Sequence, residues 1–348
     1  MPDKHILMIG TGGTIASEAT GDGLAPELSA EQLLRSVPAI SSLCEVTCQQ
    51  PFSIDSTDMT PAHWLTVAAR IRENYAQYDG FVISHGTDTM AYTAAALSYL
   101  IQGGDKPIVL TGAQKPIGFD TTDSKVNLED AFRCASSGHL PGVQIVFNGR
   151  VIAGTRAQKT RSKSFQAFSS INYPELAVIQ DGVLIPYIQR EPSAPVFYDR
   201  LNTSVGLLKM YPGIDREVIR YLLNSHEALI IESFGVGGLP SYEDSPFAEL
   251  VWKEGVEKGK LIIMTTQVQK EGSDIAVYHV GHRLKGWERV LEAYDMTTES
   301  ALAKTMWILG QTREWNQVRN LFYTPVAWDI LYQERRDESW KEPSPPSC

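Results

Sequence analysis

The chain has 348 residues, of which 43% are hydrophobic and 21% are charged, and its formal net charge is −10. This length suits two domains, and this composition predicts a packed core and excludes a disordered chain. The acidic balance argues against a nucleic-acid-binding surface, which would need a basic stripe.

Neither a membrane span nor a disulfide framework is expected. No stretch approaches the roughly 20 apolar residues that cross a bilayer, and the first apolar run, at 5–9, is too short for a secretion signal. We therefore expect a cytoplasmic protein without membrane contact. The cysteines are scattered, which favours small buried hydrophobes over disulfides or a zinc site; they are Cys44, Cys48, Cys134 and Cys348.

The first half of the sequence alternates predicted strands and helices. Strands are predicted at 5–9, 43–47, 81–84, 107–110, 143–147 and 151–155. Helices are predicted after a capping box at 29–32, after Thr60-Pro61, through an alanine-rich segment ending at Tyr99, and over 126–135. This alternation indicates βαβ units and a parallel sheet.

Hydroxyl-bearing and glycine-bearing loops follow several of these strands. They are the segments 11–14, 56–57, 87–88 and 112–113. Because ligands bind outside the carboxyl ends of parallel strands, we expect these loops to meet at one edge of the sheet and form a site there.

The pattern changes around 190–195, where prolines and polar residues predict a linker. A second set of strands is predicted at 207–210, 228–232 and 261–265, with helices between them, one of which opens at 245–246. A later helix is predicted to begin near Thr297. We expect a catalytic α/β domain at 1–190, a linker at 191–204, a smaller α/β domain at 205–335 and a disordered tail at 336–348.

The first glycine-rich loop does not match a nucleotide-binding pattern. Gly10 and Gly12 fit the first half of a dinucleotide fingerprint, but Ile15 stands where the third glycine or alanine would be. A phosphate-binding loop is excluded because no Gly-Lys-Ser/Thr follows.

Two threonines are candidates for hydroxyl-nucleophile chemistry, Thr14 in the first loop and Thr87 in the second. A hydroxyl attacks a carbonyl once a neighbouring group activates it. Each position also has a structural interpretation, since Thr87 suits a helix N-cap and Asp88 suits the first turn of a helix.

The activating group is left open between two candidates. Lys159 is either part of a solvated basic patch or a base whose pKa is lowered by burial, able to take a proton from a hydroxyl. His85 directly precedes the second loop, so a Thr-His-Asp arrangement is the alternative to a structural histidine.

These loops resemble those of the bacterial-type L-asparaginase family, specifically its cytosolic type I branch. The matching segments are 11–16, 55–61, 85–90 and 111–114, with further similarity at 154–159, 233–238 and 295–301. Four separate loops in the same order make the resemblance specific, and it covers nearly the whole chain.

The resemblance implies hydrolysis of asparagine to aspartate and ammonia without a metal or cofactor. It implies that Thr14 is the nucleophile that forms an acyl-enzyme ester, and that Thr87, Asp88 and Lys159 form a second catalytic group.

For substrate binding, the resemblance implies that Asp88 meets the α-amino group and Thr87 lies beside the substrate. Ser56, with its neighbours Asp55 and Thr57, would hold the α-carboxylate, and Ala113 would offer a backbone contact near the scissile amide.

The resemblance also implies the architecture and assembly. The expected fold is a larger N-terminal domain with a flavodoxin-like or Rossmann-like parallel sheet, followed by a smaller C-terminal α/β domain. The expected assembly is a homodimer or homotetramer with sites near subunit contacts.

The sequence departs from the family pattern at two places. Leu24 stands where many relatives carry an activating loop tyrosine, with Tyr278 as a possible substitute or simply a packed aromatic. Glu232 and Val268 stand where some type I members carry an arginine and a cysteine at an effector site, so that kind of allostery is not expected.

Three functions are alternatives to that of an asparaginase. An amino-acid sensor would keep the pocket without turnover. The related amidase that serves misacylated tRNA carries an extra N-terminal domain, for which there is no room before Thr14. Glutamine differs from asparagine by one methylene, worth only about 1–3 kcal/mol in a pocket, so the preference between the two amides is left open.

Overall fold

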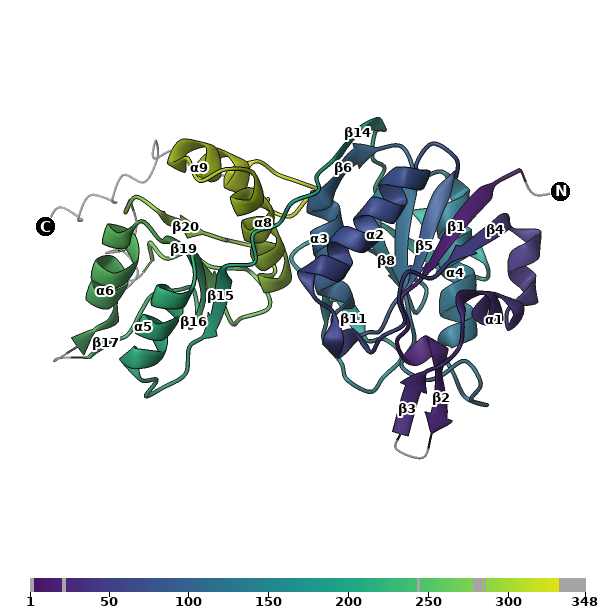
Figure 1. Ribbon diagram of the computed structural model, residues 1–348, viewed down its shortest axis with the longest axis horizontal. Coiled ribbons are helices and arrows are strands. Elements are labelled where there is room, and N and C mark those ends of the chain that lie inside the picture. Colours follow the sequence, from purple (N-terminus) through teal and green to yellow (C-terminus); the bar gives the residue numbers. More distant parts are fainter. Residues whose placement is uncertain (1–2, 21–22, 243–244, 278–283, 285, 332–348) are drawn as a thin grey trace, which may run out of the picture.

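The computed structural model describes residues 3–20, 23–242, 245–277, 284 and 286–331. A larger N-terminal domain and a smaller C-terminal domain, both α/β, lie side by side in Figure 1. They meet where helix α3 (Met90–Leu100) packs against helix α8 (Thr298–Gln311).

An eight-stranded sheet, in the order β13-β12-β9-β8-β7-β5-β1-β4, forms the centre of the N-terminal domain. Its strands are β1 (His5–Gly10), β4 (Glu45–Gln49), β5 (Gly80–Ser84), β7 (Pro107–Thr111), β8 (Gly142–Phe147), β9 (Arg150–Ala153), β12 (Ala177–Gln180) and β13 (Val183–Pro186). The predicted parallel sheet is confirmed from β4 to β8, whereas β8, β9, β12 and β13 pair antiparallel. The pairs β8–β9 and β12–β13 are hairpins, joined by the two-residue turns Asn148-Gly149 and Asp181-Gly182. Such short turns leave no room for the helix that a parallel connection requires.

Helices cover both faces of this sheet. They are α1 (Ala30–Arg35), α2 (Pro61–Asn74), α3 and α4 (Ser124–Ser137). The capping box predicted at 29–32 is confirmed, because Ser29 and Gln32 satisfy each other's backbone N–H groups. Apolar side chains of α2 and α3 pack on one face of the sheet, and those of α1 and α4 pack on the other.

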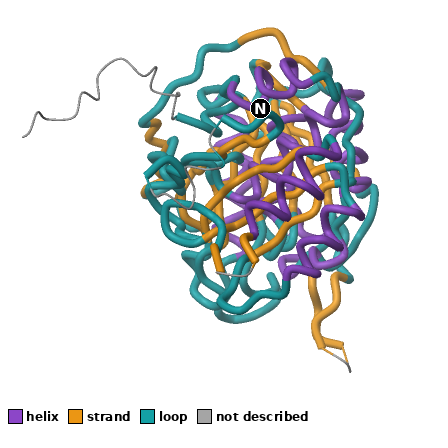
Figure 2. Tube along the Cα trace, turned by 90° about the vertical axis from the view of Figure 1, so that its left-hand side faces the viewer, coloured by secondary structure: helices purple, strands orange, loops and turns teal. Residues whose placement is uncertain are grey.

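Shorter elements complete the N-terminal domain. They are the 3₁₀ turns η1 (Thr14–Ala16), η2 (Pro38–Ser42) and η3 (Ser56–Asp58), and the antiparallel pairs β2 (Ser17–Thr20) with β3 (Gly23–Pro26), β10 (Ala157–Lys159) with β11 (Phe168–Ser170), and β6 (Ile101–Gly104) with β14 (Ser193–Phe197). The β2–β3 hairpin projects from the domain in Figures 1 and 2. Strand β14 lies inside the predicted linker 191–204, so that segment is partly tied to the N-terminal domain.

The C-terminal domain is built on a four-stranded, wholly parallel sheet. Its elements are β15 (Val205–Lys209), α5 (Arg216–Ser225), β16 (Ala228–Ser233), β17 (Ser241–Tyr242), β18 (Ser245–Pro246), α6 (Phe247–Leu250), the π-helical turn η4 (Val251–Gly255), the 3₁₀ turn η5 (Val256–Lys258), β19 (Leu261–Thr266), β20 (Val290–Glu292), α8 and α9 (Trp315–Tyr323). The helix predicted to open at 245–246 begins at Phe247, because 245–246 pair with 241–242 as a short strand. The helix predicted near Thr297 is α8, which Thr297 caps by accepting a bond from the Ser300 N–H.

None of the helices in the described part of the chain combines the length and the apolar character that crossing a membrane requires. The predicted tail, 336–348, lies outside the described residues.

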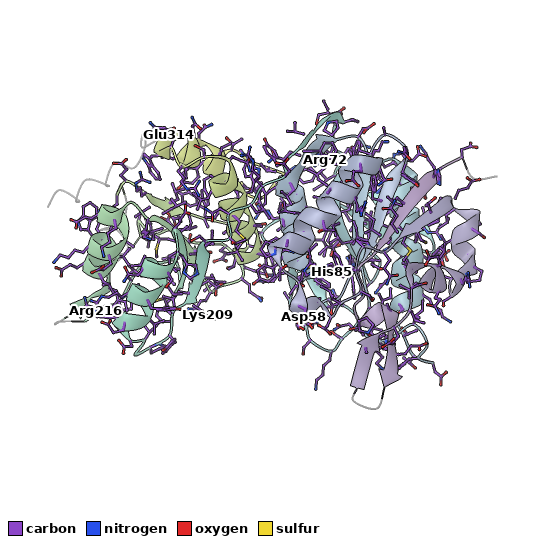
Figure 3. All side chains as sticks on the ribbon, in the orientation of Figure 1. Asp58, Arg72, His85, Lys209, Arg216 and Glu314 are labelled. Carbon is purple, nitrogen blue, oxygen red and sulfur yellow. The ribbon has the colours of Figure 1, made fainter. Side chains whose placement is uncertain are left out.

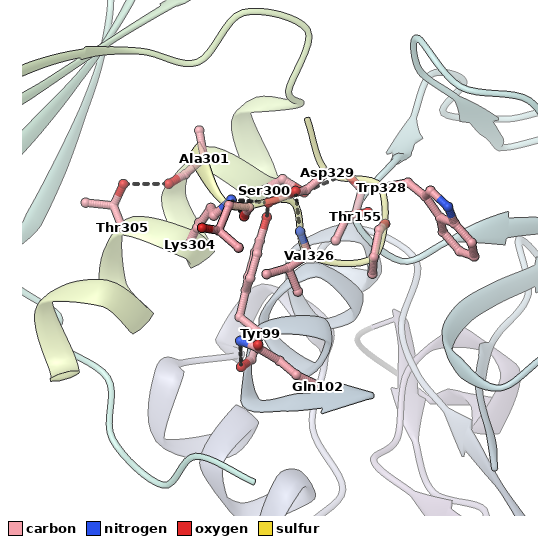
Figure 4. Close-up of polar contacts among 12 residues, drawn as sticks. Tyr99, Gln102, Thr155, Ser300, Ala301, Lys304, Thr305, Val326, Trp328 and Asp329 are labelled. Carbon is pink, nitrogen blue, oxygen red and sulfur yellow. Dashed lines mark hydrogen bonds and ion pairs between the residues drawn. The ribbon is translucent and has the colours of Figure 1, made fainter. Parts of the chain in front are cut away.

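A buried ion pair of the C-terminal domain lies at the junction with the N-terminal domain, where Tyr99 bonds to it (Figure 4). The Lys304 ammonium on α8 lies 2.6 Å from the Asp329 carboxylate, and neither side chain is exposed. The Tyr99 hydroxyl on α3 donates to the same carboxylate oxygen at 2.9 Å. Burial lowers the pKa of Lys304, an effect that the charge of Asp329 opposes.

The buried Arg156 side chain forms a second set of hydrogen bonds between the domains. Its guanidinium donates to the Asp295 carboxylate at 2.8 Å, to the Asp295 carbonyl at 2.7 Å and to the Trp328 carbonyl at 2.5 Å. Because Arg156 directly precedes β10, these bonds hold the start of that strand against the C-terminal domain.

We predict that Lys304→Met lowers the free energy of unfolding by about 3–5 kcal/mol, because it leaves the Asp329 charge buried and uncompensated. The double variant Lys304→Met with Asp329→Asn should recover much of this loss, since the asparagine is uncharged, its oxygen still accepts the bond from the Val326 N–H and its NH2 group can donate to the Tyr99 oxygen. Urea titration followed by tryptophan fluorescence measures both, and equal stability of the single and double variants would contradict the prediction.

Candidate active site

Four loops were singled out in the sequence. The first loop (11–14) follows β1, the second (87–88) follows β5, the third (56–57) follows β4 and the fourth (112–113) follows β7. These strands are neighbours in the order β4-β1-β5-β7. All four strands run parallel, so their carboxyl ends lie along one edge of the sheet. The first loop is tied to its neighbours by the backbone. The Gly13 N–H donates to the Ile54 carbonyl at 3.0 Å, and the Thr11 N–H donates to the Ser84 carbonyl at 3.1 Å.

The backbones of Gly13 and Gly86 touch where the first and second loops cross. A Cβ atom on Gly13 would collide with the Gly86 nitrogen and Cα, and Gly13 has a φ of +81°. A Cβ atom on Gly86 would collide with the Ser56 side chain of the third loop. Only glycine allows both contacts. Thr14 and Thr87 each follow one of these glycines, so the two threonine loops are held together.

Thr87, Asp88 and Lys159 form one connected group. The Lys159 ammonium donates to the Thr87 hydroxyl at 2.8 Å and to the Asp88 carboxylate at 2.7 Å. The Lys159 side chain is only 18% exposed whereas that of Asp88 is 59% exposed, which leaves the carboxylate open to a ligand. Lys159 is therefore paired at this edge of the sheet and is not part of a solvated basic patch.

A polar cluster beneath the fourth loop sets its path. The Asp123 carboxylate, which is 6% exposed, accepts bonds from the N–H groups of Gln114 and Lys115 and from the Asn127 side chain. Ala113, which directly precedes Gln114, is fully buried. The Gln114 amide oxygen accepts a bond from the Thr87 hydroxyl at 3.3 Å, which links the fourth loop to the second.

The loop after β4 is an Asx turn. The Asp55 carboxylate accepts bonds from the N–H and the hydroxyl of Thr57, both at 2.8 Å, and caps η3. Asp55 and Thr57 are exposed and bond each other, whereas Ser56 between them is buried and faces Gly86. The Thr89 hydroxyl donates to the Ser56 carbonyl at 2.8 Å, so this turn is also tied to the second loop.

His85 lies inside the N-terminal domain beside α3, in contrast to Asp58 on the surface (Figure 3). Its ring is fully buried, with Nδ1 2.6 Å from the Gly86 carbonyl and Nε2 2.9 Å from the Thr93 hydroxyl. Burial lowers the pKa of this imidazole to about 4. Because neither ring nitrogen faces Thr14, Thr87 or Lys159 as a partner, the histidine alternative has no hydrogen bond to support it.

Behind Lys159, the C-terminal domain supplies a buried carboxyl. Gln158 points away from Lys159 on β10, and its amide nitrogen lies 3.4 Å and 3.5 Å from the two Glu299 oxygens. The pKa of Glu299 is raised to about 7, chiefly by burial and to a smaller extent by the charge of Glu232, while hydrogen bonds from its own backbone and from Gln158 oppose the rise. Glu232 accepts a bond from the Thr298 hydroxyl at 2.5 Å.

The structure describes only some of the residues at which the sequence departs from the family pattern. Tyr278 and the Leu24 side chain lie outside the described residues, although the Leu24 backbone belongs to β3. Glu232 is the penultimate residue of β16 and contacts Thr298 of α8, and Val268 is 50% exposed in the loop after β19. The prediction on allostery stays a prediction.

The supporting residues Asp123, Asn127 and Glu299 were not among the sequence candidates. No sequence pattern pointed to them: Asp123 directly precedes α4 but makes no side-chain cap bond to it, and instead bonds the N–H groups of Gln114 and Lys115. Within the described ranges, no three or more His, Cys, Asp or Glu side chains gather as they would around a metal ion.

Two family models match the chain. Residues 5–191 match the model described as "Asparaginase, N-terminal", and residues 204–322 match "Glutaminase/Asparaginase C-terminal domain".

Individual relatives are similar over most of the chain. The L-asparaginase of Thermococcus kodakarensis is 36% identical over 93% of this chain and 98% of its own length. L-asparaginase 1 of Escherichia coli is 32% identical over 92% of this chain and 96% of its own length.

Two solved structures agree. That of the T. kodakarensis enzyme superimposes with a TM-score of 0.88 at 34% identity, over 94% of this chain and 100% of that chain. That of L-asparaginase I from Vibrio cholerae has a TM-score of 0.83 at 32% identity, over 94% of this chain and 99% of that chain.

The raised pKa of Glu299 predicts a pH dependence of stability. Folding keeps a proton on this carboxyl that the unfolded chain releases near its ordinary pKa of 4.5, so the contribution is present below pH 4.5 and lost as the pH rises through about 7. Its size is about 3 kcal/mol.

Glu299→Gln, which stays uncharged, should therefore gain stability relative to the unchanged protein between pH 5 and pH 8. Urea titrations at the two pH values measure the difference, with Glu288→Gln at an exposed position as the control. The same effect of Glu299→Gln at both pH values would refute the prediction.

Proposed function

The chain belongs to the asparaginase family, and on this premise we propose that it hydrolyses L-asparagine to L-aspartate and ammonia through an ester formed on Thr14. The observation that carries the proposal is the connected group of Thr87, Asp88 and Lys159, held beside Thr14 by the contact of Gly13 with Gly86.

In the proposed first step, the Thr14 hydroxyl attacks the carboxamide carbon of asparagine. The hydroxyl proton leaves Thr14 and the amide nitrogen departs as ammonia, which leaves an ester on the Thr14 oxygen. Backbone N–H groups of the glycine-rich first loop stabilise the negative charge that develops on the substrate oxygen.

In the proposed second step, water hydrolyses the ester and releases aspartate. Thr87 and Lys159 serve as the proton-transfer pair, because the Lys159 nitrogen already lies 2.8 Å from the Thr87 hydroxyl. Asp88 keeps Lys159 in place through the bond at 2.7 Å.

Charge complementarity supports the proposed binding mode. Asp88 offers its exposed carboxylate to the substrate ammonium. Ser56, in the turn shaped by Asp55 and Thr57, binds the α-carboxylate, and the backbone at Ala113 lies near the scissile amide.

By its resemblance to type I members we also place the protein in the cytoplasm, as a homodimer or homotetramer. Light scattering of the purified protein measures the assembly, and a monomer at working concentration would rule it out.

We expect purified protein to release ammonia from asparagine and Thr14→Ala to lower kcat by about 10³-fold or more while the protein stays folded. Thr66→Ala on α2 is the matched control. Parallel assays with glutamine measure the preference between the two amides.

A wild-type protein that binds asparagine with a saturable calorimetric heat but releases no ammonia would be a sensor and would overturn the proposed activity. Near-normal turnover by Thr14→Ala would exclude Thr14 as the nucleophile.

We expect Lys159→Met to lower kcat by about 10²–10⁴-fold, the usual contribution of a proton-transfer group. Lys163→Met, at an exposed position on the same segment, should leave kcat unchanged. The pH dependence of kcat is the second readout, and an unaltered profile in Lys159→Met would argue against proton transfer by this residue.

A further inference from the structure

A chain of buried hydrogen bonds ends at the peptide between Gly86 and Thr87. The Trp64 indole N–H on α2 donates to the Thr93 hydroxyl on α3 at 3.0 Å. The Thr93 hydroxyl lies 2.9 Å from His85 Nε2, and His85 Nδ1 lies 2.6 Å from the Gly86 carbonyl. His85 and Thr93 are fully buried and Trp64 is 5% exposed, so water does not compete for these bonds.

The chemistry of the partners fixes the direction of every bond. A carbonyl only accepts, so His85 Nδ1 carries the proton, and an indole N–H only donates, so the Thr93 oxygen is an acceptor for Trp64. The Thr93 proton is then free to be donated to His85 Nε2, which accepts in the neutral ring. A protonated ring would instead donate from Nε2 to the Thr93 oxygen, and burial, which holds the pKa of His85 near 4, favours the neutral tautomer.

The captured carbonyl determines how the next residue is presented. In a trans peptide the carbonyl and the following N–H point in opposite directions, so a Gly86 carbonyl held by His85 directs the Thr87 N–H away from the imidazole. Thr87 is only 4% exposed, and in the part of the chain that the structure describes its N–H has no hydrogen-bond partner. A buried donor without a partner is costly unless a ligand satisfies it.

We propose that His85 is a positioning residue of the active site, whose Nδ1–H holds the Gly86 carbonyl and thereby sets the Gly86–Thr87 peptide and the Thr87 hydroxyl beside Lys159. The ring takes no part in proton transfer. Trp64 and Thr93 act through it by fixing its tautomer. This inference builds on the proposed asparagine hydrolysis, since kcat is its measure.

Two substitutions at His85 test the hydrogen bonds of Nδ1 and Nε2 separately. An asparagine amide reaches about as far as imidazole Nδ1, so His85→Asn can still donate to the Gly86 carbonyl. A glutamine amide reaches about as far as Nε2, so His85→Gln keeps a partner for Thr93 but loses the donor to Gly86. His139→Gln, at an exposed position after α4, is the matched control.

We expect His85→Gln to lower kcat about 10²-fold, because small misplacements of reacting groups have effects of this size. His85→Asn should stay within about tenfold of the unchanged protein. Neither variant should change the pH dependence of kcat. Thr93→Val, which removes only the hydroxyl that donates to Nε2, should lower kcat less than His85→Gln.

A purely structural histidine would give a different result, with both His85 variants losing thermal stability while their folded fractions keep the kcat of the unchanged protein. Equal kcat values for the asparagine and glutamine variants, or an altered acid limb of the pH profile, would each overturn the proposal. If His85→Gln does not fold, the comparison of His85→Asn with Thr93→Val decides the matter. A wild-type protein without activity would instead refute the function itself.

Discussion

The active-site edge depends on a contact between two backbones. Gly13 and Gly86 approach so closely that a Cβ on Gly13 would collide with the Gly86 nitrogen, and Ser56 packs against Gly86 from the third loop. Any side chain at position 13 or 86 would push the loops apart and separate Thr14 from Thr87. The close approach of the two threonine loops is therefore set by the absence of side chains at positions 13 and 86.

The C-terminal domain acts on this edge from behind, through the short strand β10. Arg156, just before the strand, is bonded to Asp295 and Trp328, while Gln158 within it meets Glu299. Since side chains alternate along a strand, the residue after Gln158 points the other way, and Lys159 reaches Thr87 and Asp88. The contacts with the C-terminal domain and the lysine that bonds Thr87 and Asp88 are thus on opposite faces of one strand.

Much of the fold follows from local sequence patterns that predict strands and helices. The wholly buried strands β5, β7 and β8 came from continuous apolar runs, and the start of α1 from the Ser29 capping box. Strand β9 was predicted at 151–155 without its antiparallel direction, whereas β12 and β13 were missed because they are short and half of β13 is exposed. The Asn148-Gly149 and Asp181-Gly182 turns were the overlooked signal, since such pairs favour two-residue hairpins.

The sequence by itself determined the family, the succession of strands and helices, and the convergence of Thr14, Ser56, Thr87 and Ala113 on one edge, because parallel strands align their carboxyl ends. Only the tertiary structure decided that Lys159 pairs with Asp88 and that His85 is held as a neutral ring by Thr93. Both depend on contacts between residues that no periodicity links and on burial that changes the proton affinity of a side chain. Spacing along a chain carries neither kind of information.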